Sequence, residues 1–120
     1  MRIVYVEDNP ANIALVQRIC PMSKDDLVTF GDASSALDAI GPDSADLILM
    51  DINLGNYSLN GLELTGLLRQ KGVQTPIVIV TAYDATGYPE QFEAAGFNEF
   101  VPKPVSIRGM IDLFNSYRQN

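Results

Sequence analysis

The chain of 120 residues contains no histidine and only one cysteine. Without an imidazole, a serine–histidine triad, a histidine metal site and a histidine general base are all excluded. This chain also cannot carry phosphohistidine, so any phosphohistidine must come from a partner. The single thiol, Cys20, excludes an intrachain disulfide, and its apolar helical surroundings favour a small core residue.

Basic residues are scarce, and long apolar runs are absent. Eight lysines and arginines face fifteen aspartates and glutamates, giving a net charge of −7. Such a chain repels a polyanion, so we expect no direct binding to nucleic acid. No apolar run approaches the ~20 residues of a membrane span, and the Met1-Arg2 start does not resemble a signal peptide. We therefore expect one cytoplasmic domain over residues 1–120.

Apolar runs alternate with helical patterns along the whole chain. The predicted strands are Arg2–Val6, Leu27–Phe30, Asp46–Met50, Pro76–Val80 and Phe97–Val101. Apolar residues at helical spacing predict helices around Ile13–Cys20, Ala33–Ile40, Leu64–Leu68, Tyr88–Ala95 and Ile107–Phe114. No repeat, low-complexity tract or linker interrupts this alternation.

Local signals predict where some of these helices begin and end. Pro10 suits the first position of a helix, with Asn9 or Asp8 before it as the cap, and Ser106 suits the cap of the last helix. Three glycines follow helical stretches, where a left-handed backbone is wanted: Gly41, Gly72 and Gly96.

Alternating strands and helices predict an α/β fold: a doubly wound, five-stranded parallel sheet with helices on both faces (flavodoxin-like). The first, third and fourth strands are nearly continuous apolar runs and belong in the centre. The order 2-1-3-4-5 satisfies this, and it places a ligand crevice outside the carboxyl ends of strands 1 and 3.

Charged and hydroxyl side chains follow four of the predicted strands. Glu7 and Asp8 follow the first strand, Asp51 the third, Thr81 the fourth and Lys103 the fifth. Two carboxylates ~4 Å apart repel by roughly 4 kcal/mol at an effective dielectric of ~20. A hard divalent cation such as Mg²⁺ offsets that repulsion. The residues therefore predict a site for a metal and a phosphoryl group.

Within this site each residue type suggests a task. The Asp51 carboxylate is able to attack phosphorus and form an acyl phosphate. Thr81, followed by the small Ala82, offers a hydroxyl to a phosphoryl oxygen, and Lys103 offers a point charge. In the empty site we expect the Lys103 ammonium to pair with Asp51.

Four motifs in order carry a family resemblance: Glu7-Asp8-Asn9, Leu-Ile-Leu-Met-Asp51, Thr81-Ala82 and Lys103-Pro104. Over its whole length the chain resembles a response-regulator receiver domain of two-component signalling. The resemblance implies that Asp51 is the phosphoacceptor. It implies that Mg²⁺ (or Mn²⁺) is bound by Asp8 and Asp51, by Glu7 mainly through water, and by the backbone carbonyl of Asn53.

The resemblance also implies how a signal enters and leaves. Thr81, Ala82 and Lys103 would contact the phosphoryl group, Phe100 would be the aromatic switch residue, and Lys103-Pro104 would be a cis peptide. The phosphoryl donor would be a histidine kinase or a histidine phosphotransfer protein. A downstream protein or an output domain would respond to the surface of the fourth helix, fifth strand and last helix. Such a domain catalyses only its own phosphorylation and slow dephosphorylation.

Four departures and three alternatives accompany this interpretation. The segment Ile52–Asn60 is about two residues longer than the family's usual loop, ends in Asn60 where an aspartate is common, and has Leu54-Gly55 where a proline is common; Phe100 lacks the commoner tyrosine's hydroxyl. A degenerate receiver that serves only as an interaction module stays open. An aspartate-nucleophile phosphatase is disfavoured by Asn53, where a second acid is expected. A flavin- or nucleotide-binding module is disfavoured because Glu7 and Asp8 repel a phosphate.

Overall fold

The computed structural model describes residues 1–51, 61–81 and 96–118. The strands are β1 (Arg2–Val6), β2 (Asp26–Phe30), β3 (Leu47–Met50), β4 (Ile77–Thr81) and β5 (Glu99–Pro102). The described helices are α1 (Pro10–Met22), α2 (Ala33–Ala39), α3 (Gly61–Gln70) and α5 (Ile107–Tyr117). The helix expected around Tyr88–Ala95 lies outside the described residues. All neighbouring strands pair in parallel, in the order β2-β1-β3-β4-β5, which confirms the predicted fold class.

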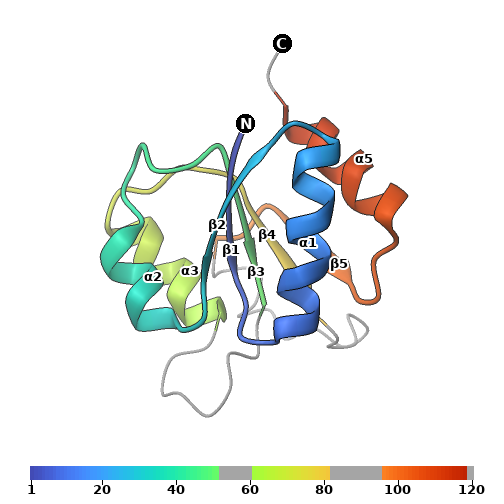
Figure 1. Ribbon diagram of the computed structural model, residues 1–120. Helices are drawn as coiled ribbons and strands as arrows, with labels where there is room; N and C mark the ends of the chain where they lie inside the picture. Colours follow the sequence, from blue (N-terminus) through green and yellow to red (C-terminus); the bar gives the residue numbers. More distant parts are fainter. Residues whose placement is uncertain (52–60, 82–95, 119–120) are drawn as a thin grey trace.

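The described helices cover both faces of the sheet (Figure 1). Helices α1 and α5 lie on one face, and α2 and α3 lie on the other. The strands run so that their carboxyl ends share one edge of the sheet, at the bottom of Figure 1, while the amino terminus and the end of α5 lie at the opposite edge. None of the described helices is both long and apolar enough to cross a bilayer.

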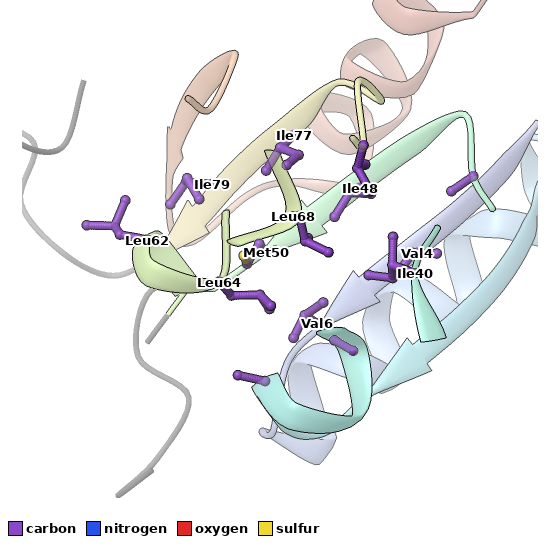
Figure 2. Close-up of a cluster of buried hydrophobic side chains, with 14 residues drawn as sticks. Val4, Val6, Ile40, Ile48, Met50, Leu62, Leu64, Leu68, Ile77 and Ile79 are labelled. Atoms are coloured by element: carbon purple, nitrogen blue, oxygen red, sulfur yellow. The ribbon is translucent and has the colours of Figure 1, made fainter. Parts of the chain in front are cut away.

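Side chains alternate between the two faces along each central strand, as the two-residue period of a strand requires. Against α2 and α3 lie residues such as Val4, Ile48 and Ile79, and Figure 2 shows their cluster. The other face carries Ile3 and Tyr5 of β1 together with the intervening residues of β3 and β4. Both clusters are buried, so the sheet forms a rigid base for whatever side chains follow its strands.

The helix starts follow the predicted chemistry. Asn9, not Asp8, is the cap of α1: its side chain accepts hydrogen bonds from the amides of Ala11 and Asn12, and Pro10 is the first helical residue. Ser106 caps α5 by accepting from the Gly109 amide at 2.9 Å. Both caps lie on connections that leave the carboxyl edge of the sheet, so they fix the direction in which α1 and α5 leave the site.

Two of the three predicted left-handed glycines are confirmed. Gly72 and Gly96 have φ of 97° and 99°. The prediction for Gly41 is wrong, because α2 ends before it and Ile40 is the extended cap residue. The amide of Gly41 instead donates to the Ser44 hydroxyl at 2.7 Å, which makes a turn without a left-handed residue.

The last strand begins two residues later than predicted. The range Phe97–Val101 becomes Glu99–Pro102, because Asn98 serves as a side-chain acceptor before the strand starts. Its Oδ1 oxygen accepts from the Ile77 amide at 2.9 Å and from Arg69 at 3.0 Å. This fixes the register between β4 and β5 and leaves Lys103 as the first residue after β5.

Replacing the α5 cap tests how firmly this helix is anchored beside the site. We expect Ser106→Ala to lower the free energy of unfolding by about 1 kcal/mol, because the Gly109 amide loses its partner. Ser34→Ala is the control, since Ser34 is an exposed residue inside α2 and alanine favours a helix. Urea denaturation measures both, and equal effects would contradict the assignment of the cap.

Candidate functional site at the carboxyl edge

Three predicted residues meet where β1, β3 and β5 end. The Glu7 amide donates to the Phe30 carbonyl of β2 at 3.0 Å, and the Asp51 amide donates to the Val6 carbonyl of β1 at 3.1 Å. The sheet's hydrogen bonds therefore continue one residue beyond β1 and β3. Both carboxylates are thus attached to fixed backbone, and Lys103 approaches them from the end of β5.

The Lys103 ammonium bridges the two carboxylates. Its Nζ lies 2.8 Å from Oε2 of Glu7 and 3.1 Å from Oδ2 of Asp51. The Glu7 side chain is 1% exposed, that of Asp51 9% and that of Lys103 16%. The sequence led us to expect the contact with Asp51, whereas the shorter contact with Glu7 was not foreseen. One cation is thus shared by two nearly buried anions, so the cluster keeps a negative excess.

Burial and this charge balance set the protonation of the pair. Burial raises the pKa of Glu7, and the nearby Asp51 charge adds to the rise, although hydrogen bonds from Lys103 and the Asn9 amide act against it. Burial by itself lowers the pKa of Lys103, but its hydrogen bonds and ion pairs with Glu7 and Asp51 outweigh this, so the net pKa is raised. Lys103 therefore stays an ammonium, whereas the net pKa of Glu7 is raised, because its donors only partly offset burial and the charge of Asp51.

A residue that the sequence reasoning missed completes the cluster. The buried hydroxyl of Tyr5 donates to Oε2 of Glu7 at 3.1 Å. Burial, and then the charge of Glu7, raise the pKa of this phenol, so it is a neutral donor. A signal was available: positions 5 and 7 share one face of a strand, so a tyrosine two residues before an acid points the same way.

The three carboxylates expected to form one cluster, those of Glu7, Asp8 and Asp51, are not grouped together in the structure. Asp8 is exposed, and within residues 1–51, 61–81 and 96–118 no three acidic or thiol side chains are grouped to hold a metal ion. Lys103 contacts both Glu7 and Asp51, whereas in the described part of the chain no contact of the Asp8 side chain with them brings it into this cluster. The donors still suit a hard cation, because all are carboxylate oxygens, one of them solvent-accessible, at an edge with excess negative charge.

The remaining predicted residues are placed only in part. Asn53 and Ala82 lie outside the described residues. Thr81 is the last residue of β4 and pairs in register with Pro102, next to Lys103. Phe100 is half-buried and packs against the cluster between the sheet and α3. The Lys103-Pro104 peptide bond is cis, as the resemblance implied.

Sequence comparison decides the family. The response regulator receiver domain matches residues 3–115. The chain belongs to this family. It is also 32% identical, over 117 residues, to the polar-differentiation response regulator DivK of Brucella anthropi, covering 96% of this chain and 94% of the relative.

Solved receiver domains share the fold over nearly the whole chain. The receiver domain of a sensor histidine kinase from Pseudomonas aeruginosa is 26% identical, with a TM-score of 0.83 over 97% of this chain and 95% of the other. That structure holds a magnesium ion coordinated in its active-site cleft. The chemotaxis protein CheY4 of Vibrio cholerae superposes with a TM-score of 0.85 over 98% of both chains, and at 18% identity it shows the fold alone. This receiver thus belongs to a family that works with histidine kinases and output domains.

Proposed function

We propose that this receiver takes a phosphoryl group from a partner's phosphohistidine onto the Asp51 carboxylate. One observation carries the proposal: a nearly buried carboxylate at the end of β3 faces an ammonium 3.1 Å away. In the transfer, an oxygen of Asp51 forms a bond to phosphorus as the phosphorus–nitrogen bond of the donor breaks. In this proposal the donor is a histidine kinase or a histidine phosphotransfer protein, since receivers work with histidine kinases.

The residues around Asp51 divide the work of this transfer. Glu7, Asp8, Asp51 and the backbone carbonyl of Asn53 would hold Mg²⁺ or Mn²⁺. The bound ion supplies charge neutralisation for the phosphoryl oxygens and the attacking carboxylate. Lys103 already lies beside Asp51, and its charge stabilises the oxygens of the transferred group. Thr81, followed by Ala82, offers a hydroxyl to the same group.

Phosphorylation then changes the charge of the site and, through it, the neighbouring surface. A phosphoryl group adds up to about −2 of charge, which draws Lys103 and Thr81 towards it. Because Lys103 leads from β5 into α5 through Pro104, this pull is exerted on the surface that includes β5, Phe100 and α5. We propose that a downstream protein or output domain reads this surface, and that the domain has no metabolic substrate of its own.

Phosphorylation in vitro tests the proposal. Incubation with acetyl phosphate and MgCl₂ should add one phosphoryl group per chain, because the bound ion and Lys103 neutralise charge around the attacking Asp51 carboxylate. Intact-mass spectrometry detects the addition. The added group should be lost on treatment with hydroxylamine, as for an acyl phosphate. Chelation of the metal by EDTA should prevent the addition. A chain whose mass is unchanged with metal present would support an interaction module instead.

A further inference from the structure

The Glu7 carboxylate is held by three donors. Oε2 accepts from the Tyr5 hydroxyl at 3.1 Å and from Lys103 Nζ at 2.8 Å, while Oε1 accepts from the Asn9 amide at 3.1 Å. A carboxylate offers about four lone-pair positions, two on each oxygen. Three are therefore used by the protein, and both positions on Oε2 are filled. A cation or a metal-bound water approaching this oxygen must displace one of the two donors.

Of the two side chains that donate to Oε2, Tyr5 has less freedom to move than Lys103. Tyr5 lies in the middle of β1, is 2% exposed, and its side chain belongs to the cluster packed against α1 and α5. Its ring cannot swing away without disturbing buried neighbours such as Val16 and Leu49. The hydroxyl is therefore fixed against Glu7 by the core, whereas Lys103 reaches the same oxygen on a flexible stem.

Lys103 has space to rearrange. Lys103 lines a cavity of about 140 Å³ beside the site, between α1 and the start of α5. The other residues lining it include Tyr5, Asn12, Pro104 and Met110. A side chain of four methylenes next to such a cavity moves at low cost, so the ammonium is held in place by its hydrogen bonds to Glu7 and Asp51, the shorter of which is to the oriented Oε2 of Glu7.

We propose that Tyr5 is a positioning residue: its hydroxyl holds Oε2 of Glu7 towards Lys103 and so stabilises the metal-free arrangement of the site. The hydroxyl thereby competes with a divalent cation for Glu7 and sets how tightly the receiver binds Mg²⁺. This inference rests on the proposed function, since it concerns the same acidic edge. It adds a residue of the β1 core to the groups that determine metal affinity.

Tyr5→Phe removes only the hydroxyl and keeps the ring in the core. In a titration with MgCl₂ followed by backbone amide shifts, we expect the dissociation constant to fall about three- to tenfold, because one position on Oε2 becomes available and the buried anion gains more from a cation. Tyr117→Phe is the matched control. Its hydroxyl also donates to a carboxylate, Glu99 at 2.8 Å, but far from the site, so the dissociation constant should not change.

A measurement without metal tests the positioning itself. In ¹⁵N spectra of the metal-free protein, the Lys103 ammonium protons should exchange with water several-fold faster in Tyr5→Phe than in the wild type or in Tyr117→Phe. Equal exchange, or a dissociation constant for Mg²⁺ that is unchanged or higher in Tyr5→Phe, overturns the role of Tyr5. If the wild type itself does not bind Mg²⁺, the proposed function fails, and the exchange measurement still decides whether Tyr5 positions Glu7 and Lys103.

Discussion

Replacing Asp51 by asparagine should abolish phosphorylation of this receiver. The amide group of asparagine cannot provide the anionic oxygen that attacks phosphorus. Among the described residues, Glu7 is the one other carboxylate that follows a central strand and contacts Lys103. Glu7 is held on both oxygens by other donors and is 1% exposed, so it does not substitute. The measurement is the intact mass after incubation with acetyl phosphate and MgCl₂.

Phosphorylation should be lost in Asp51→Asn because the attacking carboxylate is absent, and not because the variant is unfolded. Asparagine has nearly the same shape as aspartate, and loss of the aspartate charge removes a repulsion that, after burial, raises the pKa of Glu7. Lys103 also keeps its 2.8 Å contact with Glu7. The midpoint of thermal unfolding of Asp51→Asn should therefore stay within about 4 °C of the wild-type value. Asp38→Asn, at an exposed position of α2, is the control and should be phosphorylated normally; equal labelling of both variants would exclude Asp51 as the acceptor.

The position of the site could be predicted from the sequence because it depends only on the direction of the strands. Glu7, Asp51 and Lys103 each follow a short apolar run, and parallel strands bring the ends of such runs to one edge. Errors of one or two residues in the strand bounds did not matter, since each side chain still came at the same end of its strand. The order of the strands followed from which runs were apolar throughout.

The contacts inside the site could not be predicted in the same way. Strand direction does not tell whether Lys103 reaches one carboxylate or two, because that depends on side-chain lengths and on how far each strand extends. Nor does it tell that Asp8, adjacent to Glu7, points out to solvent while Glu7 is buried. The apolar run that contains Tyr5 predicts only a central strand, and nothing in that pattern indicates that the Tyr5 hydroxyl contacts Glu7 in the site.

A third buried carboxylate, Asp25, was not predicted from the sequence for a similar reason. Asp25 precedes β2 at the edge opposite the site, and its side chain is fully buried. It accepts from Arg118 at 2.6 and 3.0 Å, from the Met1 amino group at 2.9 Å and from the Ser23 hydroxyl at 2.6 Å. The partner Arg118 is 93 residues away, and no local pattern predicts a contact over that distance. Asp25 therefore fastens α5 to the start of the sheet.

Asp25→Asn should destabilise the fold by about 3 kcal/mol, which is a large part of the stability of a small domain. The substitution leaves the Arg118 guanidinium and the Met1 amino group next to a neutral amide. One carboxylate oxygen is replaced by an NH₂ group, and this donor then faces another donor, on Arg118 or Ser23. Because Arg118 is 31% exposed and water relieves part of its charge, the effect lies at the lower end of the range for buried ion pairs. Thermal unfolding at pH 7 should show a midpoint lowered by about 10 °C.

The pH dependence separates a charge effect from a packing effect. Burial alone would raise the pKa of Asp25, but the hydrogen bonds from Arg118, Ser23 and the Met1 amino group hold it well below its usual range. A carboxyl with a lowered pKa stabilises the fold above its unfolded value of about 4 and loses that contribution as the pH falls towards the folded value. The difference in free energy of unfolding between the wild type and Asp25→Asn should therefore be largest at pH 7 and decrease below about pH 4. Asp26→Asn, at the exposed next residue, should change the stability by less than about 0.5 kcal/mol. If the difference in free energy of unfolding between the wild type and Asp25→Asn does not change with pH, Asp25 stabilises the fold through its shape and not through its charge.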